Sequence, residues 1–376
     1  MTLDVKRIKK MMKENGLDGL IVTSHENIFY VSGSGVGKQM RVAPIIFPID
    51  GNPVFLVHPS GSGAGEDIMV RQQTWIKDVR AYQGGEWAPL EIWSHISDVL
   101  TEKKLKKAKI GLELFDVPAS SFEHLKKLQP KATFVDCGPM FQKMRSVKSP
   151  EELKILSEAN MLTAKAVTIA FEMARPGDTE KKIAQNMIRL MMDYGTSKIR
   201  FLSLAAGTNV VKPHNPPGDY KIKKGDMVHV DIGGTWKGYG SDISRMAVVG
   251  NPTKKQIEAF NVIIKQMWDT VEAMQNGAPI KEVNQAAKES YESHGGKYPR
   301  YFIGHSSGLG VHEHPYIAPF DGEWILEPNM FFQLEPSHVV SDKIRVHYED
   351  GFIIQQSGPA KNISEYRSSR ELLIIK

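Results

Sequence analysis

The chain of 376 residues contains one cysteine, Cys137, and therefore cannot form an intrachain disulfide. The absence of disulfides is typical of a reducing compartment, so we expect a cytoplasmic protein. The sequence has no apolar run as long as a membrane span. Its charged first segment, residues 1–16, also lacks the apolar stretch of a secretory signal peptide. We therefore expect no membrane segment and no membrane partner.

A marked excess of charge of one sign is also absent. The 48 basic and 43 acidic residues leave a net charge of +5, and the sequence has no long basic block. Proteins that bind nucleic acid usually concentrate their basic residues, so we expect no nucleic-acid partner. Apolar residues make up 41% of the chain and charged residues 24%, which is typical of a globular protein. At this length two domains are expected.

The order of helix and strand patterns along the sequence predicts two domains of different class. Helix and strand patterns alternate over residues 1–145, which predicts an α/β domain. Long helical patterns and hairpin-like strand pairs over residues 146–376 predict an α+β domain. The second half starts at a strong helix signal, since Ser149 is a good N-cap and Glu152 completes a capping box. The expected elements are helices at 6–15, 93–105, 150–174, 179–195, 254–275 and 280–294, and strands at 17–24, 29–33, 43–49, 53–58, 109–114, 198–206, 227–233, 238–249, 331–336 and 344–356.

A first pair of carboxylates, Asp231 and Asp242, falls on one expected hairpin. A turn at Trp236-Lys237 would place the two residues opposite each other, with their Cβ atoms about 5 Å apart. Two solvated turn acids are the alternative interpretation. The neighbouring apolar residues favour a packed strand: Val228, Val230 and Ile232. Two opposed carboxylates destabilise such a strand unless something binds them.

A second pair, Glu335 and Glu349, falls on another expected hairpin, around Asp342. An exposed surface pair is again the alternative. His305 lies between the two hairpins in a glycine-rich loop, where the backbone can approach a ligand closely. Four carboxylates and one imidazole that converge repel one another unless cations lie among them. So many oxygen donors suit two divalent metal ions better than one, and such a pair generates hydroxide at neutral pH.

Other residues in expected loops could also bind a metal ion or take part in catalysis. His312 and His314 follow in the same glycine-rich segment, and His214 lies in a proline-rich one. Ordinary surface histidines are the alternative interpretation. Residues 304–308 match the G-x-S-x-G pattern of serine hydrolases, with Ser306 as the nucleophile. That pattern needs a helix after the serine, and the prolines and glycine that follow predict none.

Several segments together resemble the pita-bread metallopeptidases, which include prolidase, Xaa-Pro aminopeptidase, methionine aminopeptidase and the related hydrolase creatinase. The matching segments are HVDIGG, GYGSDISR, GHSSGLGVHEHP, FQLEP and HYEDGF. Residues 16–33 and 144–159 are similar to segments of the proline-specific branch, in which a creatinase-like domain precedes the catalytic one. The resemblance covers nearly the whole chain. It implies a creatinase-like N-terminal α/β domain at 1–145 and an α+β pita-bread catalytic domain at 146–376.

The resemblance also implies a role for each ligand. Asp231 would bind one metal ion, and His305 with Glu335 would bind the other. Asp242 and Glu349 would bridge the two ions. A hydroxide between the ions would attack the scissile carbonyl, and Glu335 would accept and return the proton. A mostly carboxylate site favours manganese, cobalt or ferrous iron over zinc.

Four residues are expected in the substrate pocket. His214 and His312 match the two histidines that contact substrate and shuttle protons in the family. Tyr301 stands where proline-specific members usually have a histidine, and His347 stands where they usually have an arginine. An arginine holds a carboxylate with two hydrogen bonds, whereas a histidine offers one donor. We therefore expect these two positions to change how substrate is held.

The leading hypothesis is a dinuclear metallohydrolase that cleaves Xaa-Pro peptides, as a dipeptidase or an aminopeptidase. The second is a pita-bread hydrolase of a small non-peptide amide or related metabolite, as creatinase-like and ectoine-hydrolase-like relatives are. The third is a non-enzymatic binding protein like the histone-binding relatives, and the complete ligand set disfavours it. Relatives of this fold are commonly homodimers, so the resemblance also implies a homodimer.

Overall fold

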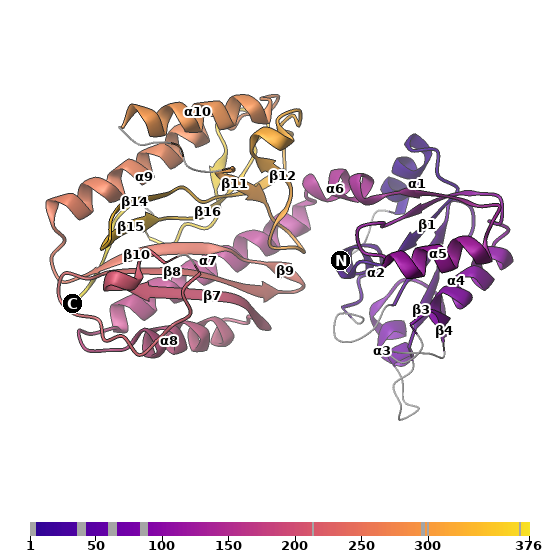
Figure 1. Cartoon of the computed structure of the whole chain (residues 1–376), viewed down its shortest axis with the longest axis horizontal. Coiled ribbons are helices and arrows are strands. Elements are labelled where there is room, and N and C mark those ends of the chain that lie inside the picture. The colour runs from indigo at the N-terminus through magenta and orange to yellow at the C-terminus, as the bar shows by residue number, and fades with distance from the viewer. Residues whose placement is uncertain are drawn as a thin grey trace. The chain divides into compact units, whose positions relative to one another are not determined.

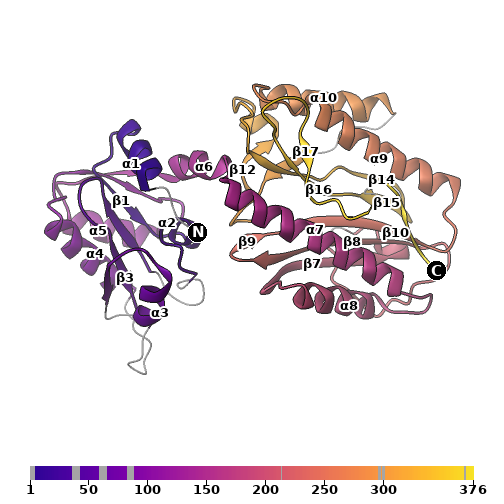
Figure 2. The same ribbon diagram turned by 180° about the vertical axis from the view of Figure 1, so that it is seen from behind.

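The computed structural model of the chain describes residues 5–35, 43–58, 66–82, 89–212, 214–294, 298, 301–367 and 370–376. The chain divides into two compact units, Met1–Met144 and Arg145–Lys376. Figures 1 and 2 show the helices and strands of each unit from opposite sides. None of the helices in the described ranges is both long and apolar enough to cross a membrane.

The N-terminal unit is built on a six-stranded mixed sheet in the order β4-β3-β2-β1-β5-β6. Its strands are β1 (Gly19–Val22), β2 (Ile45–Pro48), β3 (Val54–Val57), β4 (Asp78–Ala81), β5 (Lys109–Leu112) and β6 (Thr133–Asp136). Its helices are α1 (Val5–Glu14), α2 (His25–Ser32), α3 (Glu66–Gln73), α4 (Glu91–Glu102) and α5 (Ala119–Leu128). Apolar side chains of α4 and α5 form one core with those of the strands. The predicted α/β class of this half is confirmed.

One predicted strand, 29–33, is wrong, because these residues form the end of helix α2. The apolar run 28–31 is too short for periodicity to distinguish a buried strand from a buried helix. Gly33 closes the helix in the left-handed conformation at φ 76°. The Glu113 carboxylate accepts a hydrogen bond from the N–H of Ser24 at 3.0 Å, just before the helix. A contact distant in sequence therefore helps to fix where this helix begins.

The second unit has two main sheets, in the orders β18-β10-β8-β7 and β12-β11-β13-β16-β17, with β9 pairing with β8 and a separate β14-β15 ladder. The strands are β7 (Lys198–Ala206), β8 (Met227–Trp236), β9 (Tyr239–Gly240), β10 (Ile243–Val249), β11 (Gly304–Ser306), β12 (Glu313–Ile317), β13 (Phe331–Leu334), β14 (Ser337–Ser341), β15 (Ile344–His347), β16 (Asp350–Ile353), β17 (Lys361–Asn362) and β18 (Leu373–Ile375). The predicted α+β class is confirmed.

Helices cover the two sheets from outside. The helices are α6 (Gly138–Ser146), which crosses the division between the units, α7 (Pro150–Met173), α8 (Glu180–Asp193), α9 (Lys254–Ala273) and α10 (Ile280–Ser293). Helices α7 and α8 pack on the first sheet, and α9 and α10 pack over the core that includes the second. Figures 1 and 2 show these two helix pairs on opposite sides of the unit. The strands that carry the predicted metal ligands therefore lie inside.

The predicted capping box at the start of α7 is confirmed. The Ser149 hydroxyl accepts a hydrogen bond from the N–H of Glu152 at 3.2 Å, and the Glu152 carboxylate accepts one from the N–H of Ser149 at 2.7 Å. These reciprocal bonds satisfy two donors that a helix start otherwise leaves unpaired. The helix that begins here runs along the first sheet and brings Asn160 to the predicted ligands.

The first hairpin turns one residue later than predicted. Its turn residues are Lys237 and Gly238, at φ 47° and 90°, and not Trp236-Lys237. A two-residue turn of this kind needs positive φ at both positions, which a glycine adopts readily and a tryptophan does not. The shift changes the register, so Asp231 pairs with Ser244 and not with Asp242. Asp242 lies just before β10.

The second hairpin has the predicted register. Ser337 pairs with His347, and Leu334 pairs with Asp350. The ladders on either side therefore have the alignment that places Glu335 opposite Glu349. The backbone N–H of Tyr348 donates to the Pro336 carbonyl at 3.2 Å between the two ladders.

His305 lies in strand β11, and the expectation of a loop is wrong. The glycine before it suggested loop structure. Gly304 instead lets two strands approach, because a Cβ atom there would lie 2.4 Å from the Gln333 carbonyl oxygen. Residues 307–312 after the strand form no helix, so the serine-hydrolase pattern around Ser306 lacks its required context.

Candidate metal centre

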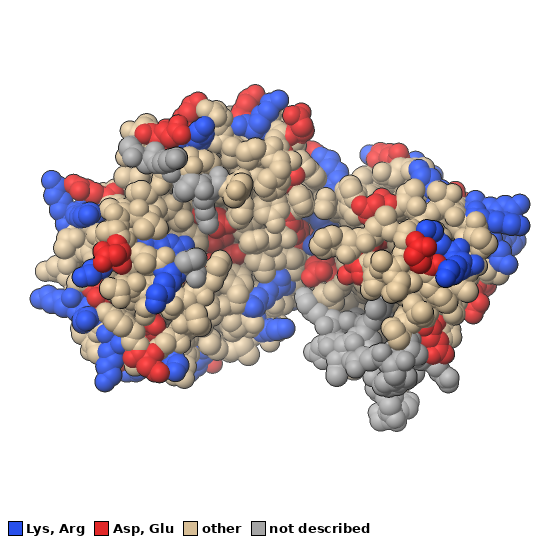
Figure 3. Space-filling model, in the orientation of Figure 1, with Lys and Arg blue, Asp and Glu red and all other residues tan. Residues whose placement is uncertain are grey.

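The five predicted ligands are brought together from both sheets. Asp231 is in β8, Asp242 just before β10, His305 in β11, Glu335 just after β13 and Glu349 just before β16. A backbone bridge between Ser244 and Glu349 joins the two sheets at this point. Asp231 is half-buried and the other four are buried. Figure 3 shows red acidic atoms recessed near the middle of this unit's visible face.

Distances between the side chains are those of a tight cluster. The His305 Nε2 atom lies 3.7 Å from Glu335 Oε1, 3.7 Å from Glu349 Oε1 and 3.9 Å from Asp242 Oδ2. Three groups have potential ligand atoms within 4.8 Å of one another: Asp231, Asp242 and Glu349; Glu335, His347 and Glu349; and Asp242, His305 and His312. Asp242 and Glu349 each belong to two groups, which suits ligands shared between two ions.

The carboxyl groups lie where their charged forms are disfavoured. Burial raises the pKa of Asp242 well above its usual value, and the carboxylates of Asp231 and Glu335 raise it further. Burial and the carboxylates of Asp242 and Glu335 likewise raise the pKa of Glu349. The Asp242 Oδ1 and Glu349 Oε1 atoms are buried without a hydrogen-bond partner among the described residues. Cations among the carboxylates would remove both penalties, so the residues present fit divalent metal ions.

Two buried amide side chains hold Asp242 in place, and neither was predicted from the sequence. The Asn160 side-chain oxygen accepts a hydrogen bond from the Asp242 N–H at 3.0 Å. Gln333 donates to the same oxygen at 2.8 Å and to the Asp242 carbonyl at 2.7 Å. Gln333 interrupts the apolar run FFQL, and Asn160 follows Leu156 by four residues, on the face of α7 expected to be apolar. A polar residue at such a position is the signal by which each could have been found.

Comparisons with known proteins now identify the family. The model of Metallopeptidase family M24 matches residues 154–356. The chain belongs to metallopeptidase family M24. A model of the Creatinase/Prolidase N-terminal domain matches residues 5–147. The protein is thus a metal-dependent hydrolase, and the predicted architecture, a creatinase-like domain followed by a pita-bread domain, is confirmed.

Individual relatives align with this M24 protein from end to end. The Xaa-Pro dipeptidase of Pyrococcus horikoshii is 28% identical over 379 residues, which cover 99% of both chains. The structure of the prolidase from the same organism has a TM-score of 0.81 at 27% identity and covers 96% of this chain and 98% of that one. The X-Pro aminopeptidase from Thermotoga maritima has a TM-score of 0.84 at 21% identity, covers 98% and 99%, and shows the shared fold.

His347 lies beside Glu335 in the centre of this M24 protein, and His229, which was not predicted from the sequence, contacts His347 from behind. The His347 Nε2 atom lies 3.5 Å from Glu335 Oε2, and its Nδ1 atom lies 3.1 Å from His229 Nε2. Burial and the nearby charge of His347 lower the pKa of His229 well below its usual value, so that its ring is neutral. His229 lies two residues before Asp231 in a strand, on the same face, and this alternation is the signal for it.

The remaining predicted pocket residues lie at different depths. The His312 ring centroid is 4.0 Å from that of His305. Burial lowers the pKa of His312, Glu335 opposes this shift and His214 adds to it, which places His214 within electrostatic reach. His214 is exposed, in a turn at φ 52°. Tyr301 is 86% exposed, so the structure leaves it at the surface.

A buried ion-pair group holds the loop that carries His312. The Glu313 carboxylate accepts hydrogen bonds from the Arg145 guanidinium, from Lys148 Nζ at 3.1 Å and from the N–H of Gly310 at 2.8 Å. Lys148 Nζ also lies 3.4 Å from the Ser306 hydroxyl oxygen. These bonds tie the last turn of α6 and the residues after it to the segment between β11 and β12.

Glu313→Gln is expected to lower the free energy of unfolding by about 3 kcal/mol at pH 7. Burial alone would raise the pKa of Glu313, but the charges of Arg145 and Lys148 lower it to about 2. Because this value lies below the ordinary 4.5, the stabilisation is present above pH 4.5 and is lost as the pH falls toward 2. Urea unfolding at several pH values measures it. An unchanged stability at pH 7, or an equal loss in the exposed control Glu323→Gln, would contradict the assignment.

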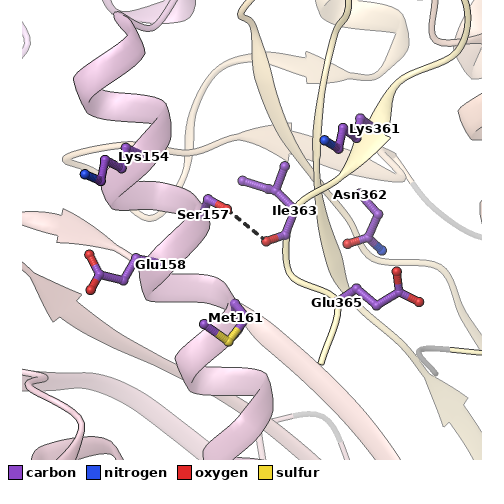
Figure 4. Close-up of a pocket in the computed structure, with 8 residues that line it drawn as sticks. All are labelled: Lys154, Ser157, Glu158, Met161, Lys361, Asn362, Ile363 and Glu365. Carbon is purple, nitrogen blue, oxygen red and sulfur yellow. Dashed lines mark hydrogen bonds between the residues drawn. The ribbon is translucent and has the colours of Figure 1, made fainter. Parts of the chain in front are cut away.

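A groove of about 550 Å³ lies elsewhere on this unit, between α7 and the segment around β17. Figure 4 shows the eight residues that line it: Lys154, Ser157, Glu158, Met161, Lys361, Asn362, Ile363 and Glu365. The Ser157 hydroxyl donates to the Ile363 carbonyl across it at 3.3 Å. No predicted metal-centre residue lines this groove, and its charges are mixed, so it does not extend the candidate site.

Proposed function

We propose that this M24 protein hydrolyses Xaa-Pro peptides with two divalent metal ions, as a dipeptidase or an aminopeptidase. The observation that carries this proposal is the convergence of four carboxylates and His305 in a chain that aligns over its whole length with an Xaa-Pro dipeptidase. Residues 1–145 would form the creatinase-like domain and residues 146–376 the catalytic domain.

The ligands divide into three sets. Asp231 would hold one ion, His305 and Glu335 would hold the other, and Asp242 and Glu349 would be shared. When bound, the ions supply hydroxide at neutral pH and polarise the scissile carbonyl. A donor set of carboxylate oxygens with an imidazole favours manganese, cobalt or ferrous iron over zinc.

The other side chains would move protons and orient the peptide. Glu335 presents Oε1 toward His305 and Oε2 toward His347, and we assign to it the transfer of the proton from water to the leaving amine. His312 lies beside His305 and would donate a hydrogen bond to the peptide carbonyl. His214, His347 and Tyr301 would contact more distant parts of the substrate.

A second candidate function is hydrolysis of a small non-peptide amide. It is favoured by His347, which is buried beside Glu335 at a position where proline-specific relatives usually have an arginine. An imidazole there offers less to a substrate carboxylate than a guanidinium does. A substrate that lacks this carboxylate would then be bound as well as a peptide that has it.

We also propose that the enzyme is cytoplasmic and forms a homodimer. The single cysteine supports a cytoplasmic enzyme. The resemblance to commonly dimeric relatives supports a homodimer.

Metal-stripped protein is expected to have no activity and to recover it with Mn²⁺ or Co²⁺. The substrates would be Ala-Pro, Leu-Pro, Met-Pro and Arg-Pro-Pro, with Ala-Ala as the control. Release of the N-terminal residue from the proline peptides alone supports the proposal, and the preferred length distinguishes dipeptidase from aminopeptidase. A protein that binds about two ions but hydrolyses none of these peptides would favour the small-amide alternative.

A further inference from the structure

Aromatic rings lead from the metal centre along the edge of the second sheet. Strand β12 is the outer strand of that sheet, beside β11 (Figure 1), and its Tyr316 pairs with His305 in β11. Residues paired across a ladder point to the same face, so Tyr316 shares the face that His305 presents to the other ligands. The His305 ring centroid lies 4.0 Å from that of His312 and 6.1 Å from that of Tyr316.

Two phenylalanines extend this set of rings toward the surface. The ring centroid of the half-buried Phe302 lies 5.3 Å from that of Tyr316 and 6.3 Å from that of His312. Phe320, in the short 3₁₀ helix η2 (Pro319–Asp321), has its centroid 5.5 Å from that of Tyr316 and is 60% exposed. Phe302, Tyr316 and Phe320 thus form an aromatic row. Rings in contact that stay partly exposed are typical of a surface that binds a ligand.

The aromatic row extends past the first residue of the leaving group. The ring centroid of His312, the proposed hydrogen-bond donor to the peptide carbonyl, lies 6.1 Å from that of Tyr316, and Phe320 lies one ring further along the row. Consecutive Cα atoms of an extended peptide are about 3.8 Å apart. A proline held beside His312 would therefore reach Tyr316, whereas Phe320 would be reached only by the residue that follows the proline.

A buried carboxylate lies beside Tyr316. Asp321 Oδ2 accepts a hydrogen bond from the N–H of Tyr316 at 2.7 Å and lies 2.7 Å from His314 Nδ1. A negative charge brought close to this carboxylate would be repelled. A proline with a free C-terminal carboxylate is therefore disfavoured near Tyr316, whereas an amide bond from the proline to a third residue carries no charge.

We propose that the aromatic row is a subsite for the residue that follows the proline, and that it selects peptides of three or more residues whose third residue is apolar or aromatic. This inference rests on the proposed hydrolysis of Xaa-Pro peptides. Aromatic rings prefer offset or edge-to-face contacts. Tyr316 and Phe320, whose planes are inclined by 58°, offer both a face and an edge to a third ring.

Relative rates measure the selection. With Mn²⁺-loaded protein, kcat/KM for Ala-Pro-Phe is expected to exceed that for Ala-Pro-Gly about 10-fold, mostly through KM. Phe320→Ala and Tyr316→Leu are each expected to reduce this ratio about fivefold, whereas Tyr316→Phe keeps the ring and should retain the ratio. Ile257→Ala, which removes an exposed apolar side chain of α9, is the control. A ratio near one in the unchanged protein, or an unchanged ratio in both Phe320→Ala and Tyr316→Leu, overturns the proposal.

Binding of a product separates this inference from the proposed function. Pro-Phe is expected to bind the Mn²⁺-loaded protein about fivefold more tightly than Pro-Gly in calorimetry, and Phe320→Ala should remove the difference. Because no turnover is needed, a protein that hydrolyses no proline peptide would contradict the proposed function and still test the aromatic row. Equal affinity for the two dipeptides overturns the inference. A changed oligomeric state in Phe320→Ala, with both preferences retained, would place Phe320 between copies of the chain and would also overturn it.

Discussion

Asp242→Ala and Glu349→Ala are each expected to abolish metal binding and turnover while the chain still folds. Each of these carboxylates belongs to two of the groups whose ligand atoms lie within 4.8 Å. If the two carboxylates are shared between two ions as proposed, loss of either one would remove a donor from both ions, and both ions would be lost together. The fold is expected to survive because the two sheets are stabilised by their backbone ladders and by the hydrophobic cores under both helix pairs, and not by these two side chains.

Metal analysis and peptide hydrolysis measure this effect, with Asp342→Ala at the exposed tip of the β14-β15 hairpin as the matched control. Without metal, a substitution at Asp242 is expected to raise the stability of the fold. Asp242→Asn is expected to unfold at a higher temperature than the metal-free unchanged protein, because it removes a buried carboxylate that the Asp231 and Glu335 carboxylates repel. Full activity in Asp242→Ala or Glu349→Ala would refute the dinuclear assignment.

His312→Ala is expected to lower kcat about 10²-fold while both metal ions remain bound. The His312 ring lies against that of His305, and it offers a ring nitrogen within 4.8 Å of potential ligand atoms of Asp242 and His305. We expect it to contact substrate, because the other five residues supply the ligands proposed for two ions. Its loss should therefore remove a proton donor to the substrate and leave the ions in place. The ring is neutral near pH 7, since burial lowers its pKa, so it can both donate and accept a hydrogen bond.

Single-turnover rates and metal content distinguish this role from a structural one. His294→Ala, which changes an exposed histidine after α10, is the control and should leave kcat unchanged. If His312→Ala also loses metal, His312 is a ligand and not a proton donor. An unchanged kcat would remove it from the mechanism.

The cluster of candidate metal ligands could be predicted from the sequence because these residues conflict with their surroundings. Asp231 and Glu335 are carboxylates within or beside strands that are otherwise apolar, and that placement is unfavourable without a ligand. The register of the second hairpin could be predicted for a related reason. Its turn at Asp342 and Lys343 lies midway between two apolar runs, so one alignment of the two strands pairs their apolar residues best.

The register of the first hairpin could not be predicted in the same way. Moving the turn by one residue, from Trp236 to Lys237 as its first position, changes every pair along the ladder. The apolar pattern tolerates either position, and only the backbone conformation of Lys237 and Gly238 decides between them. Asp231 and Asp242 still converge, because side chains displaced along a ladder remain within reach of a shared ion.

For residues that act through others, the sequence indicates at most that a polar side chain is buried, and it does not predict what that side chain contacts. Asn160 is near Asp242 because α7 packs on the first sheet, and His229 meets His347 because two sheets join at Ser244 and Glu349. Each of these contacts depends on how separate elements dock, and no local pattern records it. The same holds for Glu113, which accepts a hydrogen bond at the start of α2. The apolar run within α2 did not by itself distinguish a helix from a strand.

The ion pairs of Glu313 have a consequence for where the chain can be divided. Sequence patterns place the end of the first half at residue 145, yet the Arg145 side chain binds Glu313, next to His312. Cutting the chain at that point would deprive the catalytic half of one of the two cations that neutralise a buried carboxylate. Arg145 and Lys148 both belong to the second compact unit, Arg145–Lys376. An exchange of N-terminal domains between relatives would therefore have to leave both cations with the catalytic half.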